Sequence, residues 1–78
     1  MACGHVMPAG TSIYRWEGHI EVAPEVQVFC KTAAARVEAL VARIRALHPY
    51  DLPEILTLPV EGGLEAYRAW VNAEVLGD

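Results

Sequence analysis

The side chains that could bind a soft metal ion are two cysteines and three histidines, scattered along a chain of 78 residues. Thiolates favour Cu(I), so Cys3 is a candidate ligand by residue type. The chain has no Cys-x-x-Cys or His-x-x-x-His spacing, so a chelate would have to be assembled in three dimensions or between subunits. The structural alternative is that Cys3 packs as a small core residue.

The other cysteine and two of the histidines have structural interpretations. Cys30 alternates with Val26 and Val28 in a run of β-forming residues, which predicts a place on the apolar face of a strand. His5 and His19 also lie in strand-like segments, and we expect them to be exposed rather than to bind metal.

Signatures of the common catalytic sites are absent from the sequence. It contains no Gly-x-Ser-x-Gly turn, no phosphate loop and no Gly-x-Gly-x-x-Gly motif. Gly62 and Gly63 precede a helical pattern and could bind an anion at the helix N-terminus, which alone is a weak signal. We therefore expect a protein that is not an enzyme.

Composition and charge exclude several kinds of partner. The net charge is −4, and the six basic residues form no run, which argues against nucleic acid. No apolar stretch is long enough to cross a membrane, and no signal-peptide pattern opens the chain, so we expect a cytoplasmic protein. The hydrophobic fraction of 54% is high for one small domain, which favours burial of apolar surface against another subunit.

The elements that would position these side chains begin with a hairpin. A long strand is expected over residues 11–22, with Gly18 as a bulge inside it. Residues 23–25 would form the turn and residues 26–31 the second strand. A short β-like trace precedes them and is broken at residues 8–10 by proline and glycine.

Two helices and a third strand are expected after the hairpin. Thr32 is a candidate cap for a helix that ends near His48, because Pro49 disfavours the helical conformation of the residue before it. Residues 54–60 alternate as a strand, which a right-handed crossover would place parallel to residues 26–31. A short amphipathic helix follows. This order predicts an α+β domain with its helices on one face of a sheet.

Several short motifs, each weak alone, occur in order along the chain. They are Ser12-Ile13-Tyr14-Arg15-Trp16-Glu17-Gly18, Lys31-Thr32, His48-Pro49-Tyr50-x-x-Pro53-Glu54, Leu58-Pro59-Val60-Glu61-Gly62-Gly63 and Tyr67-x-x-Trp70. Together, over residues 2–74, they resemble the CutA family of divalent-cation tolerance proteins. The resemblance implies a ferredoxin-like, PII-like fold with an antiparallel or mixed sheet, a tight homotrimer formed through the sheets, and a link to copper and other divalent metals.

The resemblance also implies that one unit of the family is missing. Members typically begin with a strand and a helix before the segment that Ala2 and Cys3 resemble, so residues 1–78 are expected to form a single CutA-like domain without that unit. Because the first strand of a ferredoxin-like sheet is central, its loss would leave unpaired ladder groups and a bare core face. A shortened chain, a mis-assigned start and a partial sequence are three open explanations.

Two sets of site residues follow from the resemblance. His48 is a candidate copper ligand with Cys3 as a second, and the alternative for His48 is a cap on the helix C-terminus. Lys31, Glu61, Tyr50 and Trp16 gather near a cleft between subunits in this family, where they could hold a small anion or metabolite. The alternative for Trp16 is packing in the trimer interface, and for Glu61 a turn before the two glycines.

Two functional hypotheses remain open. In the first, a homotrimer takes part in metal tolerance and binds copper weakly. In the second, a PII-like signalling or scaffolding trimer binds a metabolite or a protein partner in its inter-subunit clefts. An enzyme is a third and weaker hypothesis.

Overall fold

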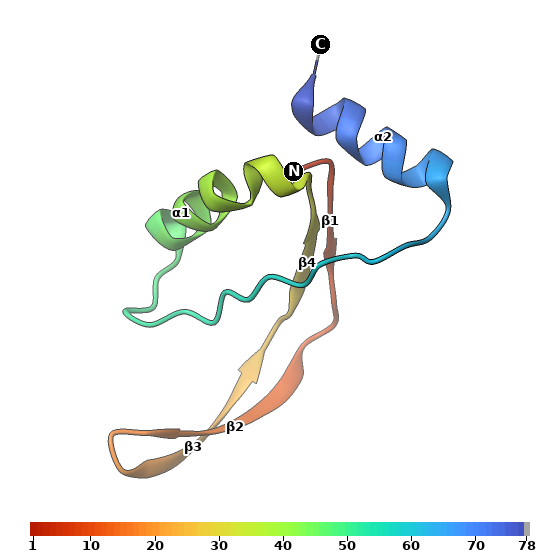
Figure 1. Cartoon of the computed structure of the whole chain (residues 1–78). Coiled ribbons are helices and arrows are strands. Elements are labelled where there is room, and N and C mark those ends of the chain that lie inside the picture. Colours follow the sequence, from red (N-terminus) through yellow and green to blue (C-terminus); the bar gives the residue numbers. More distant parts are fainter. Residues whose placement is uncertain (78) are drawn as a thin grey trace.

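The computed structural model of the protein describes residues 1–77 and has the expected α+β composition (Figure 1). The chain forms two antiparallel strand pairs and two helices. The elements are β1 (Cys3–Val6), β2 (Gly10–Trp16), β3 (His19–Glu25), β4 (Val28–Lys31), a short 3-10 turn (Ala34–Arg36), α1 (Val37–Leu47) and α2 (Glu65–Leu76). The β2–β3 pair extends away from the two helices, and β1 and β4 lie between it and them (Figure 1).

The hairpin differs from the one that the sequence predicted. β2 pairs with β3, and Trp16 lies opposite His19 across a two-residue loop. Glu17 and Gly18 in that loop have φ angles of 49° and 81°, the left-handed values of a type I′ turn. The predicted single strand over residues 11–22 is therefore wrong, because Gly18 belongs to a tight turn and not to a bulge.

The predicted pairing of residues 26–31 with the strand over residues 11–22 is also wrong. β4 does not return along β2. It pairs antiparallel with β1, with Cys3 opposite Lys31 and Val6 opposite Val28. The β-like trace near the N-terminus is thus a true strand, and the proline and glycine of residues 8–10 mark the junction between the two strand pairs.

The first helix begins differently from the prediction and ends as predicted. Thr32 does not cap it, since the Thr32 hydroxyl oxygen is buried without a hydrogen-bond partner. The chain enters through the 3-10 turn instead. At the other end, His48 is extended and its backbone N–H donates to the carbonyl of Ile44 at 2.9 Å. Pro49 follows, so the helix ends where the proline requires it to.

The third predicted strand is not formed. Residues 54–60 run as an extended segment past β4 towards α2, but they pair with no strand among the described residues (Figure 1). Alternating side chains give an extended segment one apolar face. A β-strand also needs backbone hydrogen bonds to a neighbouring strand, which this segment lacks among the described residues. The predicted parallel crossover is therefore absent as a hydrogen-bonded pair.

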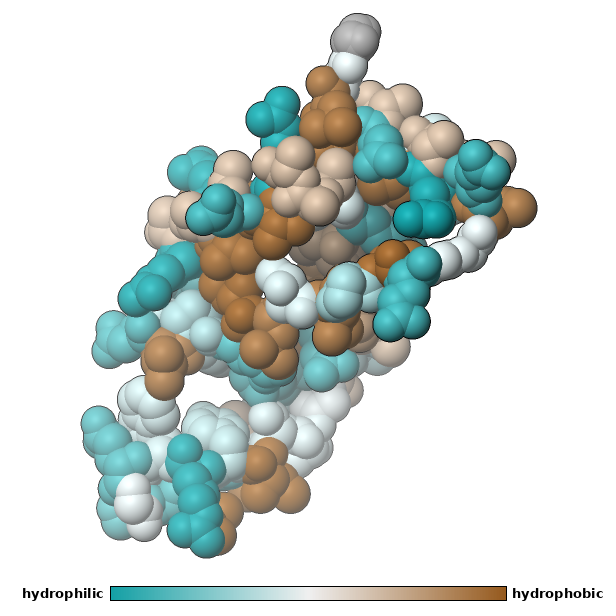
Figure 2. All heavy atoms as spheres, in the orientation of Figure 1, coloured by the Kyte–Doolittle hydropathy of each residue, from teal (hydrophilic) through white to brown (hydrophobic). Residues whose placement is uncertain are grey.

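Very little of the chain is buried. Among the described residues the buried apolar side chains are Ala33 and Val71. The solvent-accessible area is 6792 Å², against about 4,700 Å² for a compact monomer of this mass. Apolar side chains gather around a hollow between the helices and the extended segment (Figure 2). No described helix has both the length and the apolar character needed to span a bilayer.

Candidate functional site

Trp16 and Tyr50, two of the predicted site residues, line one pocket. The pocket has a volume of about 560 Å³ and lies where the hairpin meets the corner that follows α1. Tyr14 also lines it, so Tyr14 and Trp16 lie on the same face of β2. Residues two apart in a strand point to the same face, so β2 holds both aromatic side chains on one side of the hairpin.

The charge of this pocket disfavours an anion within one chain. Its lining includes the carboxylates of Glu25, Asp51 and Glu54, and no lysine or arginine of the described part of the chain belongs to it. Carboxylates repel a phosphate or a carboxylate ligand through direct Coulomb interaction. Sequence reasoning missed these acidic residues, because strand β3 and the corner after α1 meet only in three dimensions.

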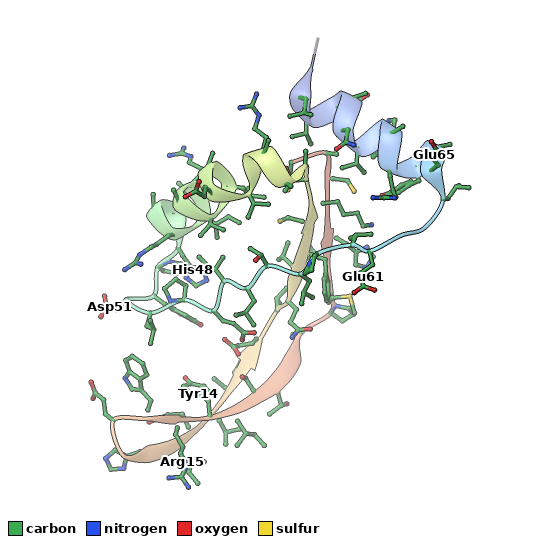
Figure 3. The ribbon with its side chains drawn as sticks, viewed as in Figure 1. Tyr14, Arg15, His48, Asp51, Glu61 and Glu65 are labelled. Atoms are coloured by element: carbon green, nitrogen blue, oxygen red, sulfur yellow. The ribbon has the colours of Figure 1, made fainter. Side chains whose placement is uncertain are left out.

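His48 uses its ring to hold the corner after α1. Its Nδ1 accepts a hydrogen bond from the backbone N–H of Tyr50 at 3.2 Å. The two rings meet edge to face, with centroids 4.8 Å apart. The His48 ring thus interacts with Tyr50, which follows it in the sequence. The C-terminus of α1 is capped by the backbone N–H of His48 and not by its side chain. Figure 3 shows His48 and Asp51 at this corner.

This hydrogen bond has a consequence for metal binding. A neutral imidazole whose Nδ1 accepts a hydrogen bond carries its proton on Nε2. A metal on Nε2 would require the proton to move to Nδ1, where it would face the Tyr50 N–H. A metal on Nδ1 would displace that N–H directly. Binding at either nitrogen of His48 therefore costs the bond to Tyr50.

Cys3 and Lys31 lie together at the other end of α1. They are opposite each other in the β1–β4 ladder, and both approach Tyr67 of α2. The Cys3 sulfur is 3.6 Å from the Tyr67 hydroxyl, and the Lys31 ammonium is 5.7 Å from the centre of the Tyr67 ring. The second distance is within the range of a cation–π interaction. Sequence reasoning placed Tyr67 on a helix but could not link it to Cys3, because the link depends on the unforeseen β1–β4 pairing.

The structure does not bring Cys3 and His48 together. Cys3 lies beside the chain as it enters α1, and His48 lies where the chain leaves it. Eleven residues of helix separate these points, a length of about 16 Å. No group of three or more His, Cys, Asp or Glu side chains within residues 1–77 is arranged to hold a metal ion.

The remaining candidates are dispersed. Glu61 lies on the exposed connection to α2, away from the corner that carries His48 (Figure 3). It lines neither the pocket of Trp16 and Tyr50 nor the larger hollow between the helices and the extended segment. His5 and His19 are exposed, as predicted. Cys30 is half-buried on β4. Of the four predicted ligand-binding residues, Trp16 and Tyr50 line the smaller pocket, Lys31 and Tyr50 line the larger hollow, and Glu61 lines neither.

Comparisons with known proteins give a consistent result. The family described as "CutA1 divalent ion tolerance protein" matches residues 1–74. Divalent-cation tolerance proteins CutA from Pectobacterium atrosepticum and Salmonella newport are each 42% identical over 74 residues, which is 95% of this chain. The chain spans 67% of the first and 64% of the second, or about two thirds of their length.

Solved structures agree with the sequence comparison. A divalent cation tolerance protein from Thermus thermophilus superposes with a TM-score of 0.90 at 38% identity, over 95% of this chain and 72% of that one. A PII-like protein CutA from a Nostoc species, in apo form, gives 0.90 at 34% identity with the same coverage. The predicted PII-like α+β fold is therefore confirmed.

Proposed function

Since this chain belongs to the CutA1 family of divalent ion tolerance proteins, we propose that it acts in tolerance of divalent metal ions, copper among them, as a cytoplasmic homotrimer. The observation that carries the proposal is the match over residues 1–74 at 42% identity to proteins with that role in their names. Those names describe tolerance proteins and no enzyme, and we propose no catalytic step.

The proposed metal site lies between subunits. One chain cannot place His48 and Cys3 on a single ion, because about 16 Å of helix separates them and each ligand must approach to about 2 Å. A neighbouring subunit can supply the second ligand. Binding at this site is weak, since it sacrifices the hydrogen bond between His48 and Tyr50.

The exposed surface supports the trimer. The chain exposes about 2,100 Å² more than a compact monomer of its mass. Protein interfaces commonly bury about 1,200–2,000 Å² in total, so the excess is enough for contacts with two neighbours. Apolar residues of the hairpin contribute to it, including Ile13, Ile20 and Val22.

Titration with Cu(I) under reducing conditions and with Cu(II) tests the proposal. We expect a change in an absorption or fluorescence signal that saturates, and we expect His48→Ala to abolish it. The matched control is His19→Ala, which removes an exposed histidine from the hairpin tip. An unchanged titration in His48→Ala, or an equal loss in both variants, would show that His48 is not the ligand.

A second function is favoured by the PII-like description of the Nostoc relative and by the aromatic pocket of this chain. In it, clefts between subunits bind a small metabolite or a protein partner, and metal binding is incidental. Lys31 from a neighbouring copy of the chain would then supply the positive charge that the pocket lacks within one chain. Stabilisation of the protein by such a ligand would survive His48→Ala and disappear in Lys31→Ala.

A further inference from the structure

The pocket of Trp16 and Tyr50 has three aromatic walls. Tyr14 and Trp16 come from β2, and Tyr50 comes from the corner after α1. All the residues that line the pocket belong to the segment 12–54 of one chain. Its volume of about 560 Å³ is within the range of small-molecule sites in proteins, which are mostly lined by apolar and aromatic side chains. The pocket is therefore large enough to enclose a small ligand.

The pairing of β2 with β3 sets the shape of this pocket. Ser12, Tyr14 and Trp16 are two residues apart along β2, so their side chains point to one face of the hairpin. Glu25 of β3 pairs with Gly10 and therefore points to the same face. Gly10 has no side chain and Ser12 has a short one, which leaves space between the aromatic pair and the Glu25 carboxylate.

The charge around the pocket is negative. Glu25, Asp51 and Glu54 line it, and no lysine or arginine of the described residues does. None of these carboxylates takes part in a side-chain hydrogen bond within residues 1–77. Arg15 lies on the opposite side of the hairpin from Tyr14, as the alternation along β2 requires (Figure 3). The three carboxylates therefore attract a cation to the pocket.

The arrangement of the carboxylates disfavours a metal ion as that cation. Hard divalent ions need several oxygen ligands at about 2.0–2.6 Å from one point. Glu25, Asp51 and Glu54 do not form such a group, because no three Asp, Glu, His or Cys side chains in the described part of the chain are placed to hold a metal. The faces of tryptophan and tyrosine rings attract ammonium groups, and rings also pack against methylene groups. The lining thus favours an organic cation whose charges are spread along an apolar chain.

We propose that this pocket binds a short aliphatic polyamine, a linear chain with two or three ammonium groups. Its methylene groups lie against Tyr14, Trp16 and Tyr50, and its ammonium groups lie near the separate carboxylates. The proposal rests on the second proposed function, because it names a ligand class for the same pocket. It differs from the anionic alternative in that the binding residues come from one chain and Lys31 of a neighbouring copy is not needed.

Calorimetric titration of the full chain with spermidine, at physiological ionic strength, tests the proposal. We expect saturable binding with one molecule for each chain. The matched ligand is a neutral aliphatic diol of the same chain length, which keeps the methylene groups and removes the charges. We expect the diol to bind at least about tenfold more weakly, because it makes no cation–π or ionic interaction. This comparison requires no mutation, so it does not depend on the folding of a variant.

A pair of tryptophan variants locates the binding site. Trp16 is 41% exposed and Trp70 on α2 is 43% exposed, so Trp16→Ala and Trp70→Ala remove the same side chain from similar degrees of burial. Only Trp16 lines the pocket. We expect Trp16→Ala to weaken spermidine binding by about tenfold and Trp70→Ala to leave it unchanged, with folding checked by circular dichroism.

A pair of double variants separates the pocket carboxylates from the overall charge of the protein. Asp51→Asn with Glu54→Gln removes two carboxylates from the pocket. Glu38→Gln with Glu74→Gln removes two exposed carboxylates from the helices and changes the net charge by the same amount. We expect only the first double variant to weaken spermidine binding, by about tenfold or more.

Three results would overturn the proposal. The first is the absence of saturable spermidine binding to the folded chain. The second is equal binding of the diol, which would mean that apolar contact alone is recognised. The third is an equal loss of binding in the two double variants, which would mean that only net charge matters.

Inorganic phosphate separates this proposal from the second proposed function. If phosphate raises the melting temperature, Lys31→Ala removes that effect and spermidine does not bind, the ligand of the pocket is an anion and the polyamine is wrong. If neither ligand binds, both proposals fail. Spermidine binding that survives Lys31→Ala, without an effect of phosphate, supports the polyamine.

Discussion

Single residues decide how the hairpin and the corner after α1 are shaped. Glu17 adopts a left-handed backbone conformation, which is unfavourable for a residue with a long side chain, while the following Gly18 adopts it freely. Asparagine tolerates this conformation and is the preferred residue before glycine in a type I′ turn. The turn is therefore built with one suitable and one unsuitable residue.

This gives a prediction at the scale of the residue. Glu17→Asn should stabilise the protein by about 0.5–1 kcal/mol, because it relieves the unfavourable φ without altering the strands. Thermal or urea unfolding measures the change. Glu21→Asn is the control, since it removes the same charge from an exposed position within β3, where asparagine is a poor strand former. An equal effect of both variants would mean that charge, and not the turn, is responsible.

The residues also show why part of the site could not be predicted. Trp16 and Tyr50 line one pocket because the hairpin turns at Glu17, whereas a single strand was predicted over residues 11–22. Glycine at position 18 was a local signal for a break in the strand, but glutamate before it is not one of the residues that usually mark a two-residue loop. The approach of Cys3 to Tyr67 had no local signal, because it joins the two ends of the chain.

At the scale of the element, the helices were easier to predict than the strands. The end of α1 at Leu47 follows from Pro49, and α2 follows from its apolar spacing, since both signals are local. Strand pairing depends on residues far apart in the sequence, and the pairing partners were wrongly predicted. Residues 54–60 show that local pattern alone does not predict a strand. Their side chains alternate as in a strand, but no described strand lies beside them to pair with.

Helix α2 is held to the strands through Tyr67, which gives a prediction for that element. Tyr67→Ala removes the contacts to Cys3 and to Lys31 together and should destabilise the docking of α2 by about 1–2 kcal/mol. Amide hydrogen exchange within Glu65–Leu76 should then become about tenfold faster.

The control for this prediction is Tyr14→Ala. Tyr14 is 43% exposed and Tyr67 is 42% exposed, so the two substitutions remove similar side chains from similar degrees of burial. Tyr14 lies on the hairpin, and its loss should leave exchange in α2 unchanged. Equal acceleration by both variants would mean that α2 is not anchored by Tyr67 in particular.

At the scale of the whole molecule, the chain is open rather than compact. Its radius of gyration is 15.2 Å, against about 11.5 Å for a compact domain of the same length. Its longest dimension is 47 Å and its shortest is 19 Å. With almost no fully buried apolar side chains among the described residues, the proposed trimer would have to supply much of the hydrophobic stabilisation.

Light scattering tests this conclusion. At micromolar concentration the molar mass should be about three times the 8.5 kDa of one chain, and the melting temperature should fall on dilution, because association stabilises the folded state. A folded species with the mass of one chain and a melting temperature independent of concentration would contradict the proposed trimer.

The nested order of the two strand pairs has a kinetic consequence. β1 and β4 lie on either side of the hairpin in the sequence, so they can meet only after the chain between them has folded back. A hairpin forms in about 1–10 μs, and once formed it shortens the loop that the outer pair must close. The chain should therefore fold from the tip of the hairpin inward. Glu17→Asn would then accelerate folding more than it slows unfolding, so the loop farthest from the helices controls how quickly the strands beneath them assemble.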